Sequence, residues 1–562
     1  MPPEVKHQKW WGWGYEGIPD FRYDNKPAFA PFVKANIGLD LERAAVVRAP
    51  RLADLTVPAS RAAQADLDAL AAVVGADNVV LDDETRVVHW AGRSVRDLIR
   101  TRRGEFTRVP DAVVYPGDEE ECRVLLGAAV ERGWVIIPFG GGTSISGSLQ
   151  AEDAETRVVV TVDLGRMNRL LSVDEHSGLA RVQAGILGPD LEDALGARGL
   201  TMGHLPDSFT YSTVGGWVAT RSSGMQSDKY GDIADIVKGV HLARPNGVVV
   251  LRDLPSTSTG PSVREMIIGS EGRLGIVTEV TIQVHRLPER REVIAYMFPN
   301  WDKALLAMHA VVRSEAHPVF TRISDAAETA FSLSTQKAPA STLKKVKAFG
   351  TDRLWDVLRL RGWDTDAMCI SYVCYEGSKA HNEREQKTVK DIVAAHGGIV
   401  LGSGPGALYD QKKFDTPYIR DFLLDRRTVG DVSETAVPWA KLAEVHRAGR
   451  EAVQRAFAEI GRRGFVMCHL SHSYHSGACL YFTFAFVLDD AGDDLEQYDT
   501  VKRAIQQSFM DSGATLSHHH GVGTEHRPWM TQDLSSEGVA LLAGLFASAD
   551  PSRQLNPGKV LE

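Results

Sequence analysis

Three stretches rich in glycine, serine and threonine are the first features of the sequence that could do chemistry. They are residues 138–144, residues 206–216 with their continuation 220–224, and residues 269–278. Glycines allow successive backbone N–H groups to point at one anion, and hydroxyl side chains add further donors. Such loops are typical of a site that binds a diphosphate.

The first loop matches neither common nucleotide-binding fingerprint. Ile145 stands where a G-x-G-x-x-G pattern needs its last glycine, and the Gly-Lys-Ser/Thr of a P-loop is absent. Alone, this loop is equally compatible with a turn that binds nothing. Glycine costs backbone entropy, however, and three such loops close together are best explained by close approach of a ligand. Together they predict a large cofactor in an extended conformation.

Tyr481 is a candidate for proton transfer. The alternation of a strand over residues 478–487 puts Phe482, Phe484 and Phe486 on one face and Tyr481 on the other. The phenylalanines are expected to fill a core, so Tyr481 faces elsewhere. By composition alone, a strand tyrosine is more often a packing residue with one hydrogen bond.

His518, His519 and His520 form a second candidate, in a loop or at a strand end. Neighbours in an extended chain alternate sides, so the three cannot all bind one metal ion, and we expect no metal site. A surface histidine run is the alternative. A cluster of imidazoles suits both proton transfer and the binding of a phosphate ester.

Arg420 and Arg322 could bind an anionic substrate. A guanidinium group presents two parallel donors to phosphate oxygens, which Arg420 in the sequence YIRD could supply. An arginine beside Asp421 is otherwise usually a local ion pair. The same alternative applies to Arg322, which precedes Asp325.

The composition limits the possible partners. The 562 residues include 63 basic and 73 acidic side chains, for a net charge of −10. No global positive field can collect nucleic acid, so we expect no nucleic-acid partner. The five cysteines form no C-x-x-C pair, which argues against a disulfide scaffold and favours a reducing compartment.

The elements that must position these residues alternate between strands and helices. Strands are expected at 109–115, 134–137, 158–164, 179–184, 276–285 and 478–487, and helices at 60–75, 118–133, 188–199 and 438–463. The first hundred residues otherwise look like an irregular lead-in. The pattern predicts an α+β fold.

Further motifs make the sequence recognisable. They are KWWGWGY at 9–15, GGWVATRSSGM at 215–225, YIRD at 418–421, SETAVPW at 433–439, SGACLYFTFAF at 476–486 and SHHHGVG at 517–523. With the three loops, they resemble the flavoproteins of the vanillyl-alcohol-oxidase or p-cresol-methylhydroxylase (PCMH/VAO) type. Within that superfamily the chain is most similar to the alkyl-dihydroxyacetonephosphate synthase family.

The resemblance implies a role for each candidate. Tyr481 and the three histidines would be catalytic, Arg420 would hold the substrate phosphate, and Arg322 and His204 would also contact substrate. The superfamily often links its flavin to a histidine in the first glycine loop, which this chain lacks, so we predict noncovalent FAD. The residues implied in FAD binding are Pro138, Phe139, Gly140, Gly141, Gly142, Thr143, Ser144, Asp207, Ser208, Phe209, Thr210, Tyr211, Ser212, Thr213, Thr220, Arg221, Ser222, Ser223, Glu271, Gly272, Arg273, Leu274, Gly275, Ile276 and Val277.

The implied architecture is a two-subdomain FAD-binding domain of the PCMH/VAO type with an α+β cap domain and a C-terminal segment that returns to the flavin. We expect an N-terminal lead-in or helical segment at residues 1–104, the FAD-binding domain at 105–290, the cap or substrate domain at 291–505 and the C-terminal segment at 506–562. The active site is expected between the two domains.

The implied activity is that of an alkylglycerone-phosphate synthase, a transferase of ether-lipid biosynthesis. It exchanges the acyl chain of acyl-dihydroxyacetone phosphate for a long-chain fatty alcohol, without net oxidation. The tail at 555–559 is commoner among flavin dehydrogenases, which leaves an FAD-dependent 2-hydroxy acid dehydrogenase or oxidase as the alternative. A non-catalytic flavoprotein or lipid-binding scaffold would need none of Tyr481, the histidine triplet and Arg420.

The predicted cellular location rests on targeting and membrane signals that the sequence does not show. It has neither a secretory signal nor a run of about 18 apolar residues, and it ends in KVLE instead of a peroxisomal SKL. We expect a cytoplasmic protein. Residues 332–362 mix lysines with apolar residues, which leaves open a peripheral contact with the inner membrane face, although a solvated helix face is commoner. A homodimer is also left open.

Overall fold

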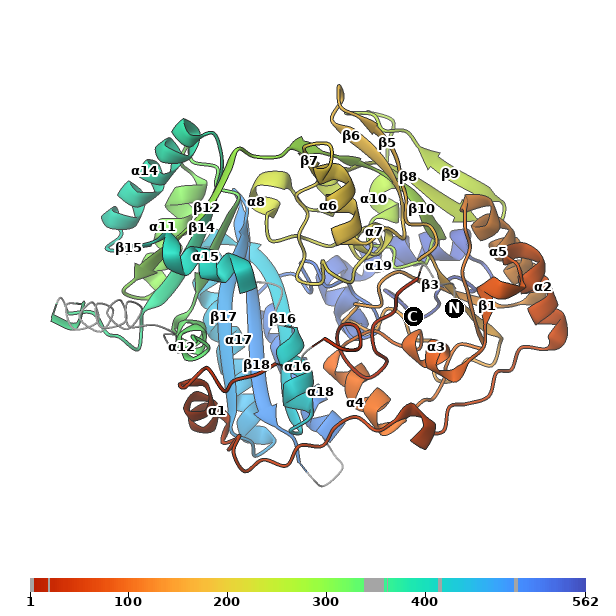
Figure 1. Cartoon of the computed structure of the whole chain (residues 1–562), viewed down its shortest axis with the longest axis horizontal. Helices are drawn as coiled ribbons and strands as arrows, with labels where there is room; N and C mark the ends of the chain where they lie inside the picture. Colours follow the sequence, from red (N-terminus) through yellow and green to blue (C-terminus); the bar gives the residue numbers. More distant parts are fainter. Residues whose placement is uncertain (1–4, 19–20, 338–357, 361, 413–416, 490–493) are drawn as a thin grey trace.

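The computed structural model describes residues 5–18, 21–337, 358–360, 362–412, 417–489 and 494–562. Two groups of sheets organise these residues (Figure 1). Two smaller sheets, built from residues before 290, lie at the right of the view, and one large sheet, drawn in green to blue, lies at the left. The predicted α+β fold is confirmed.

The first sheet carries the first glycine-rich loop at its edge. Strands β2 (Ala112–Val114), β4 (Val159–Asp163) and β3 (Val135–Phe139) are parallel neighbours, and β1 (Val79–Val80) pairs antiparallel with β2. Helix α5 (Glu119–Arg132) connects β2 to β3. The chain therefore enters the loop from the carboxyl end of a parallel strand, which is where ligands bind in such sheets.

Local sequence signals explain the bounds of α5. Asp118 caps the helix by accepting a hydrogen bond from the backbone N–H of Glu121 at 2.9 Å. Three glutamates follow in the first turn, where they favour the positive end of the helix dipole. Gly133 ends the helix in the left-handed conformation, with φ of 72°.

The second sheet is antiparallel and supports the other two loops. Its strands, in spatial order, are β5 (Leu170–Asp174), β6 (Leu179–Gln183), β10 (Ile276–Gln283), β8 (Val237–Arg244) and β9 (Gly247–Leu251). The third loop leads directly into β10. A small two-stranded sheet pairs β7 (Leu200–Thr201) with β11 (His285–Arg286).

The third sheet is antiparallel and has seven strands. In spatial order they are β15 (Ile399–Gly402), β12 (Arg290–Phe298), β14 (Cys369–Gly377), β13 (Phe320–Ser324), β17 (Gly464–Ser473), β18 (Gly477–Val487) and β16 (Thr428–Pro438). One apolar core packs the sheet mainly against α11 (Trp301–Val312), α14 (Lys379–Ala395), α17 (Leu442–Glu459) and α18 (Asp494–Asp511), with further contributions from α4 and α16, whose bounds are given below. On its other face, β16, β17 and β18 border the site, and a second apolar cluster packs β12, β13 and β14.

The remaining α-helices of the described residues are shorter, with the exception of the C-terminal one, which has a kink at Ser535. They are α1 (Phe29–Ile37), α2 (Gln64–Val74), α3 (Asp83–Val88), α4 (Val95–Arg103), α6 (Gly188–Gly196), α7 (Val214–Thr220), α8 (Ser227–Tyr230), α9 (Ile233–Ile236), α10 (Val263–Ile267), α12 (Ala326–Ser334), α15 (Ser403–Lys412), α16 (Tyr418–Leu424) and α19 (Met530–Ala549).

The predicted strands and helices are confirmed, with shifted ends. The long helix α17 begins at Leu442 and not at 438, because Pro438 still belongs to β16 and residues 439–441 form a 3₁₀ turn. The helix predicted within the first hundred residues is α2, which packs against α5, and the same stretch also contributes β1 to the first sheet. Most of the stretch 332–362 lies outside the described residues. Within the described chain, no helix combines the length and apolarity needed to span a bilayer.

Candidate functional site

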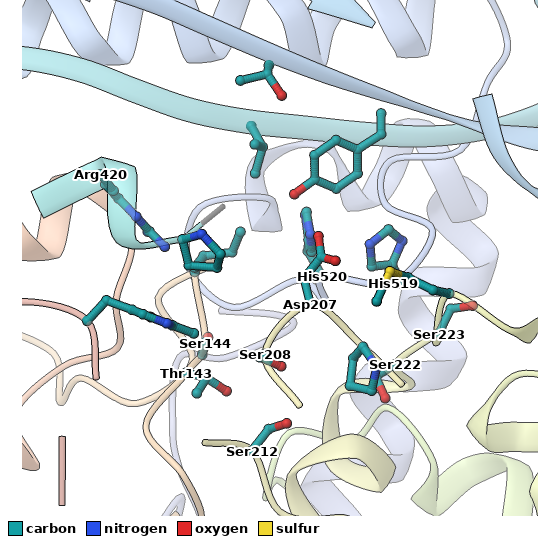
Figure 2. Close-up of a pocket in the computed structure, with 18 of the residues that line it drawn as sticks. Thr143, Ser144, Asp207, Ser208, Ser212, Ser222, Ser223, Arg420, His519 and His520 are labelled. Atoms are coloured by element: carbon teal, nitrogen blue, oxygen red, sulfur yellow. The ribbon is translucent and has the colours of Figure 1, made fainter. Parts of the chain in front are cut away.

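A cavity of about 1050 Å³ lies between the glycine-rich loops and the open face of the seven-stranded sheet. Strands β16, β17 and β18, helices α12, α15 and α16, and Asn556 near the chain end complete its walls. This volume is slightly above the ~300–1,000 Å³ that is usual for small-molecule sites. Figure 2 shows Arg420, His519 and His520 pointing toward one space above a group of serine and threonine hydroxyls.

The glycines of the first loop allow it to pack against the second loop. A Cβ at Gly141 would lie 1.6 Å from the carbonyl oxygen of Tyr211, and one at Gly140 would lie 2.3 Å from Oγ1 of Thr213. Gly142 also adopts a left-handed φ of 68°. Only glycine fits these positions, and the tight packing gathers the backbone and hydroxyl donors of two loops along one wall.

Most of the residues implied in FAD binding line the cavity. Those in the lining are Pro138, Phe139, Gly140, Gly141, Gly142, Thr143, Ser144, Asp207, Ser208, Ser212, Thr213, Thr220, Ser222, Ser223, Glu271, Gly272, Gly275 and Val277. This hydroxyl-rich and glycine-rich set fits a diphosphate and its attached groups.

Seven of the implied residues lie outside the lining: Phe209, Thr210, Tyr211, Arg221, Arg273, Leu274 and Ile276. Tyr211 has its hydroxyl 2.5 Å from that of Tyr418. Arg221 pairs with Glu265 at 2.9 Å on the surface, and Arg273 donates to backbone carbonyls of the C-terminal tail. Leu274 and Ile276 belong to the apolar core. Most of these side chains thus contact other parts of the protein and not the cavity.

His204 also lies outside the lining, and its contact with substrate stays a prediction. Its Nε2 is 2.9 Å from Oγ of Ser222, and its ring packs edge-on against Trp217. Burial lowers the pKa of His204 to about 4, so the ring is neutral at pH 7. It supports Ser222, which does line the cavity.

Glu271 joins the third loop to the segment after the histidines. Its carboxylate accepts hydrogen bonds from Oγ of Ser148 at 2.8 Å and from the backbone N–H groups of Val522 and Gly523 at 2.6 and 2.9 Å. Its backbone is left-handed, with φ of 48°. Glu271 therefore shapes the wall that carries the flavin loops and the histidine loop together.

Tyr481 faces the cavity, as the alternation of β18 predicts. Phe482, Phe484 and Phe486 are fully buried in the core on the opposite side of the strand. The Tyr481 ring is nearly parallel to His469 and to His519, with centroids 4.8 and 5.9 Å away. Burial and nearby carboxylates raise the pKa of Tyr481 well above its usual value, so it is a neutral phenol at pH 7.

Glu434 holds the histidine loop in place. Its side chain is buried and accepts four hydrogen bonds, from Oγ of Ser517 at 2.7 Å and from the backbone N–H groups of His518, His519 and His520 at 2.7, 3.1 and 3.1 Å. Burial alone would raise the pKa of Glu434, but the imidazoles and these donors hold it well below its usual value. The loop is thus wrapped around a carboxylate anion.

The imidazoles of His519 and His520 line the cavity, whereas His518 lies behind them. Burial lowers the pKa of His519 to about 3 and that of His520 to about 4, against the opposing effect of Glu434. Both rings are neutral bases at pH 7. The three histidines therefore have different environments.

Arg420 lines the cavity and is held by a neighbouring backbone. It donates to the carbonyl oxygen of Arg93, and its guanidinium lies 5.7 Å from the Trp13 ring. Its neighbour Asp421 instead accepts from Lys9 Nζ at 2.8 Å and from the Trp13 backbone N–H at 2.9 Å. Arg420 and Asp421 therefore bind different partners and do not form the local ion pair that was the alternative interpretation.

Arg322 also lines the cavity, but it is paired with a carboxylate that the sequence did not single out. Its Nη2 donates to Glu328 at 2.5 Å and lies 3.0 Å from Nδ1 of His469. Burial would raise the pKa of Glu328, but His469 and Arg322 lower it to about 2. Arg322 therefore enters the site as part of a neutralised cluster beneath Tyr481.

Comparison with known proteins gives the fold and the cofactor. Residues 110–251 match the family model described as FAD binding domain, and residues 287–560 match the one described as FAD linked oxidases, C-terminal domain. A protein of Trypanosoma brucei brucei, named alkyldihydroxyacetonephosphate synthase, is 36% identical over 88% of this chain and 80% of its own length. FAD is thus the cofactor of the cavity.

Solved structures agree. A structure of an alkyldihydroxyacetonephosphate synthase superposes with a TM-score of 0.83 at 32% identity, covering 99% of this chain and 98% of the other. A p-cresol methylhydroxylase with substrate bound superposes with a TM-score of 0.64 at 14% identity, covering 90% of this chain and 98% of the other. The second likeness shows the PCMH-type fold alone.

Release of FAD by denaturation tests how it is held. The first glycine-rich loop offers no histidine for a covalent link, and the walls that surround it supply hydroxyl and N–H donors, so we predict a dissociable cofactor. After acid precipitation of the holoprotein, the flavin absorbance should appear in the supernatant. Flavin that stays in the washed pellet would contradict this.

Glu434→Gln should destabilise the protein in a pH-dependent way. The amide puts a donor where the carboxylate accepts, so we expect a loss of about 2–4 kcal/mol at pH 7. Because the folded pKa of Glu434 is depressed, its contribution is present above the unfolded value near 4.5 and is lost as pH falls through the folded value. Thermal unfolding at pH 7 and at successively lower pH should therefore show a shrinking difference between variant and wild type.

The exposed Glu444 on α17 supplies the matched control. Glu444→Gln should leave the unfolding temperature unchanged at every pH. If Glu434→Gln and Glu444→Gln unfold alike, Glu434 does not hold the histidine loop.

Proposed function

Because this chain belongs to the alkyldihydroxyacetonephosphate synthase family, we propose that it exchanges the acyl chain of acyl-dihydroxyacetone phosphate for a long-chain fatty alcohol, without net oxidation. One observation carries the proposal beyond the family likeness. The sheet face that forms the cavity floor changes from polar to apolar along the strands, as a substrate with an ionic head and a long chain requires.

Residues paired across β17, β18 and β16 form three rows on this face. Successive rows are two residues apart along each strand, or about 7 Å. The first row can do acid–base chemistry, and the third is apolar and includes small residues. The rows are His469, Tyr481 and Glu434; then Met467, Thr483 and Val432; then Phe465, Ala485 and Gly430.

The walls beside the third row are also apolar. Phe331 of α12, and Ile419 and Leu423 of α16, line the cavity and pack in one apolar cluster with Phe465 and Ala485 of the third row. From Tyr481 to Ala485 the floor extends four residues, or roughly 13 Å. This path suits the alkyl chain of a fatty alcohol or of the fatty acid that leaves.

The polar end supplies the groups that the exchange needs. Arg420 can bind the phosphate through two guanidinium N–H donors. Tyr481 is a neutral phenol that can donate or accept a proton, and His519 and His520 are neutral bases beside it. When bound, FAD would supply an electrophilic ring to which the reacting carbon is held during the exchange.

A 2-hydroxy acid dehydrogenase or oxidase is the rival function. Its small substrate would use only the polar end of the cavity. The apolar third row and its walls would then have no ligand, and the geometry therefore favours a lipid substrate.

The location and assembly form part of the same proposal. We propose that the enzyme works in the cytoplasm, at the inner membrane face, where it could collect lipid substrates. The five cysteines are buried and free, which is compatible with a reducing compartment. A homodimer is to be tested by analytical ultracentrifugation.

Product analysis of the purified holoprotein tests the function. Incubation with acyl-dihydroxyacetone phosphate and labelled hexadecanol should give labelled alkyl-dihydroxyacetone phosphate and free fatty acid, while the flavin spectrum stays oxidised. Tyr481→Phe should lose about 10²-fold or more of the exchange rate, the usual contribution of an acid–base group, with FAD content unchanged. Anaerobic bleaching by a 2-hydroxy acid, with no ether product, would establish the rival instead.

Ala485→Phe tests the path of the alkyl chain. The larger side chain fills the third row, so exchange with hexadecanol should fall about tenfold or more, in line with the ~1–3 kcal/mol cost of overpacking. Exchange with a four-carbon alcohol serves as the control, because that chain ends before the third row. An equal loss for both alcohols would show that the chain takes another path.

A further inference from the structure

We propose that a hydrogen-bonded chain running from Asp232 through Tyr474 and His518 to His519 fixes the proton positions of the site, so that Nε2 of His519 is the base that takes the proton released by the incoming alcohol. Tyr474 and Asp232 are positioning residues in this proposal. It rests on the proposed function, and it distinguishes the three histidines, which the sequence could not do.

The chain begins outside the cavity lining, where three distant segments meet. Asp232 is the N-cap residue of α9, Tyr474 lies in the turn between β17 and β18, and His518 lies in the loop after α18. The Tyr474 hydroxyl is 2.6 Å from Oδ2 of Asp232 and 2.6 Å from Nε2 of His518. Ser223 donates to the other oxygen of Asp232 and anchors it.

Counting protons gives the direction of the first two bonds. A tyrosine hydroxyl has a single proton, and a carboxylate can only accept. Tyr474 therefore donates to Asp232 and accepts from His518, whose Nε2 must carry a proton. Burial, with the charge of Asp232, raises the pKa of Tyr474 far above its usual value, so the phenol does not ionise.

The same count continues to His519. A neutral imidazole with a proton on Nε2 has an acceptor at Nδ1. Nδ1 of His518 lies 3.0 Å from Nδ1 of His519, which must then donate. Oε2 of Glu434 lies 3.6 Å from Nδ1 of His519 and is also an acceptor, so it too favours a proton on this Nδ1. The Nε2 of His519 is consequently left without a proton.

The position of His519 makes this free nitrogen useful. His519 lines the cavity and stacks near Tyr481, whereas His518 does not reach the lining. The other titratable groups around the pair are His472, whose ring centroid is 5.1 Å from that of His518 and 5.2 Å from that of His519, together with His520, Glu434, Cys479 and Asp228. Burial keeps His472 neutral and the thiol of Cys479 protonated.

The reaction needs such a base, because exchange of an ester for an ether releases one proton. The O–H bond of the alcohol breaks and its electron pair forms the new C–O bond, while the carboxylate leaves with the electron pair of the old one. His519 Nε2 takes the proton. A proton can then move from His519 Nδ1 to His518, from His518 Nε2 to Tyr474 and from Tyr474 to Asp232, which is only partly buried and can release it to water.

The test compares Tyr474→Phe with Tyr230→Phe in the FAD-loaded enzyme. Tyr230 is the matched control, because its hydroxyl also donates to a buried carboxylate, Glu376 at 2.6 Å, but it lies outside the cavity lining. Tyr474→Phe should lower kcat for exchange about 10²-fold, with KM for acyl-dihydroxyacetone phosphate, FAD content and unfolding temperature unchanged. Tyr230→Phe should leave kcat unchanged.

A proton inventory separates a relay from a packing role. In mixtures of H₂O and D₂O, the wild-type rate should depend on the deuterium fraction along a curve, because several protons move together, and Tyr474→Phe should give a straight line. Asp232→Asn should also lower kcat, because an amide at this position can donate to Tyr474 and reverse every bond of the chain. A wild-type rate and a curved inventory in Tyr474→Phe would overturn the proposal.

Metal analysis of the purified enzyme tests whether a bound metal ion, and not a shared proton, holds the two histidines together. One ring nitrogen each of His518 and His519, a carboxylate oxygen of Glu434 and the Cys479 sulfur all lie within 4.8 Å of one another. One equivalent of a transition metal in the active enzyme would explain the close approach of the two nitrogens without a shared proton and would overturn the proposal. Absence of ether product with the wild-type enzyme would contradict the proposed function. A wild-type enzyme that makes the product, together with variants that behave as wild type, would contradict only the proton chain.

Discussion

The contact between the Glu434 carboxylate and the backbone of the histidine loop is the one on which the chemical centre depends. A buried carboxylate is costly unless donors replace the water that it loses, and here one hydroxyl and three backbone N–H groups do so. Because these donors come from four consecutive residues, the carboxylate fixes the backbone and not only one side chain. The imidazoles leave this loop in three directions, one toward Tyr474 and two toward the cavity.

The C-terminal segment completes the site through similar contacts. Asn556 donates from Nδ2 to the carbonyl oxygens of Ser148 and Glu271, and Leu555 forms a bridge with Ile136 of β3. The tail thus joins the first sheet and the third loop. Residues more than 400 positions apart meet here, because the parallel strand β3 leads into the first loop next to the returning chain.

The sequence could predict what local periodicity and glycine chemistry determine. Tyr481 faces the cavity because a strand alternates, and the three loops gather because glycine permits their close approach. Strand register is not local. Glu434 was visible only as part of a motif, and its place beside Tyr481 follows from the pairing of β16 with β18. In the same way, the contact of His469 with Glu328 joins residues 141 positions apart.

The site also answers a difficulty that any buried base presents. Burial keeps the imidazoles of His519 and His520 neutral, which a base requires, but it also penalises the imidazolium that forms when a proton is taken. Glu434 lies 3.6 and 3.5 Å from their Nδ1 atoms and is already ionised, so a positive charge formed on either ring is paired at once. The carboxylate that shapes the loop therefore also sets its basicity, and a variant that kept the shape without the charge would still lose part of the rate.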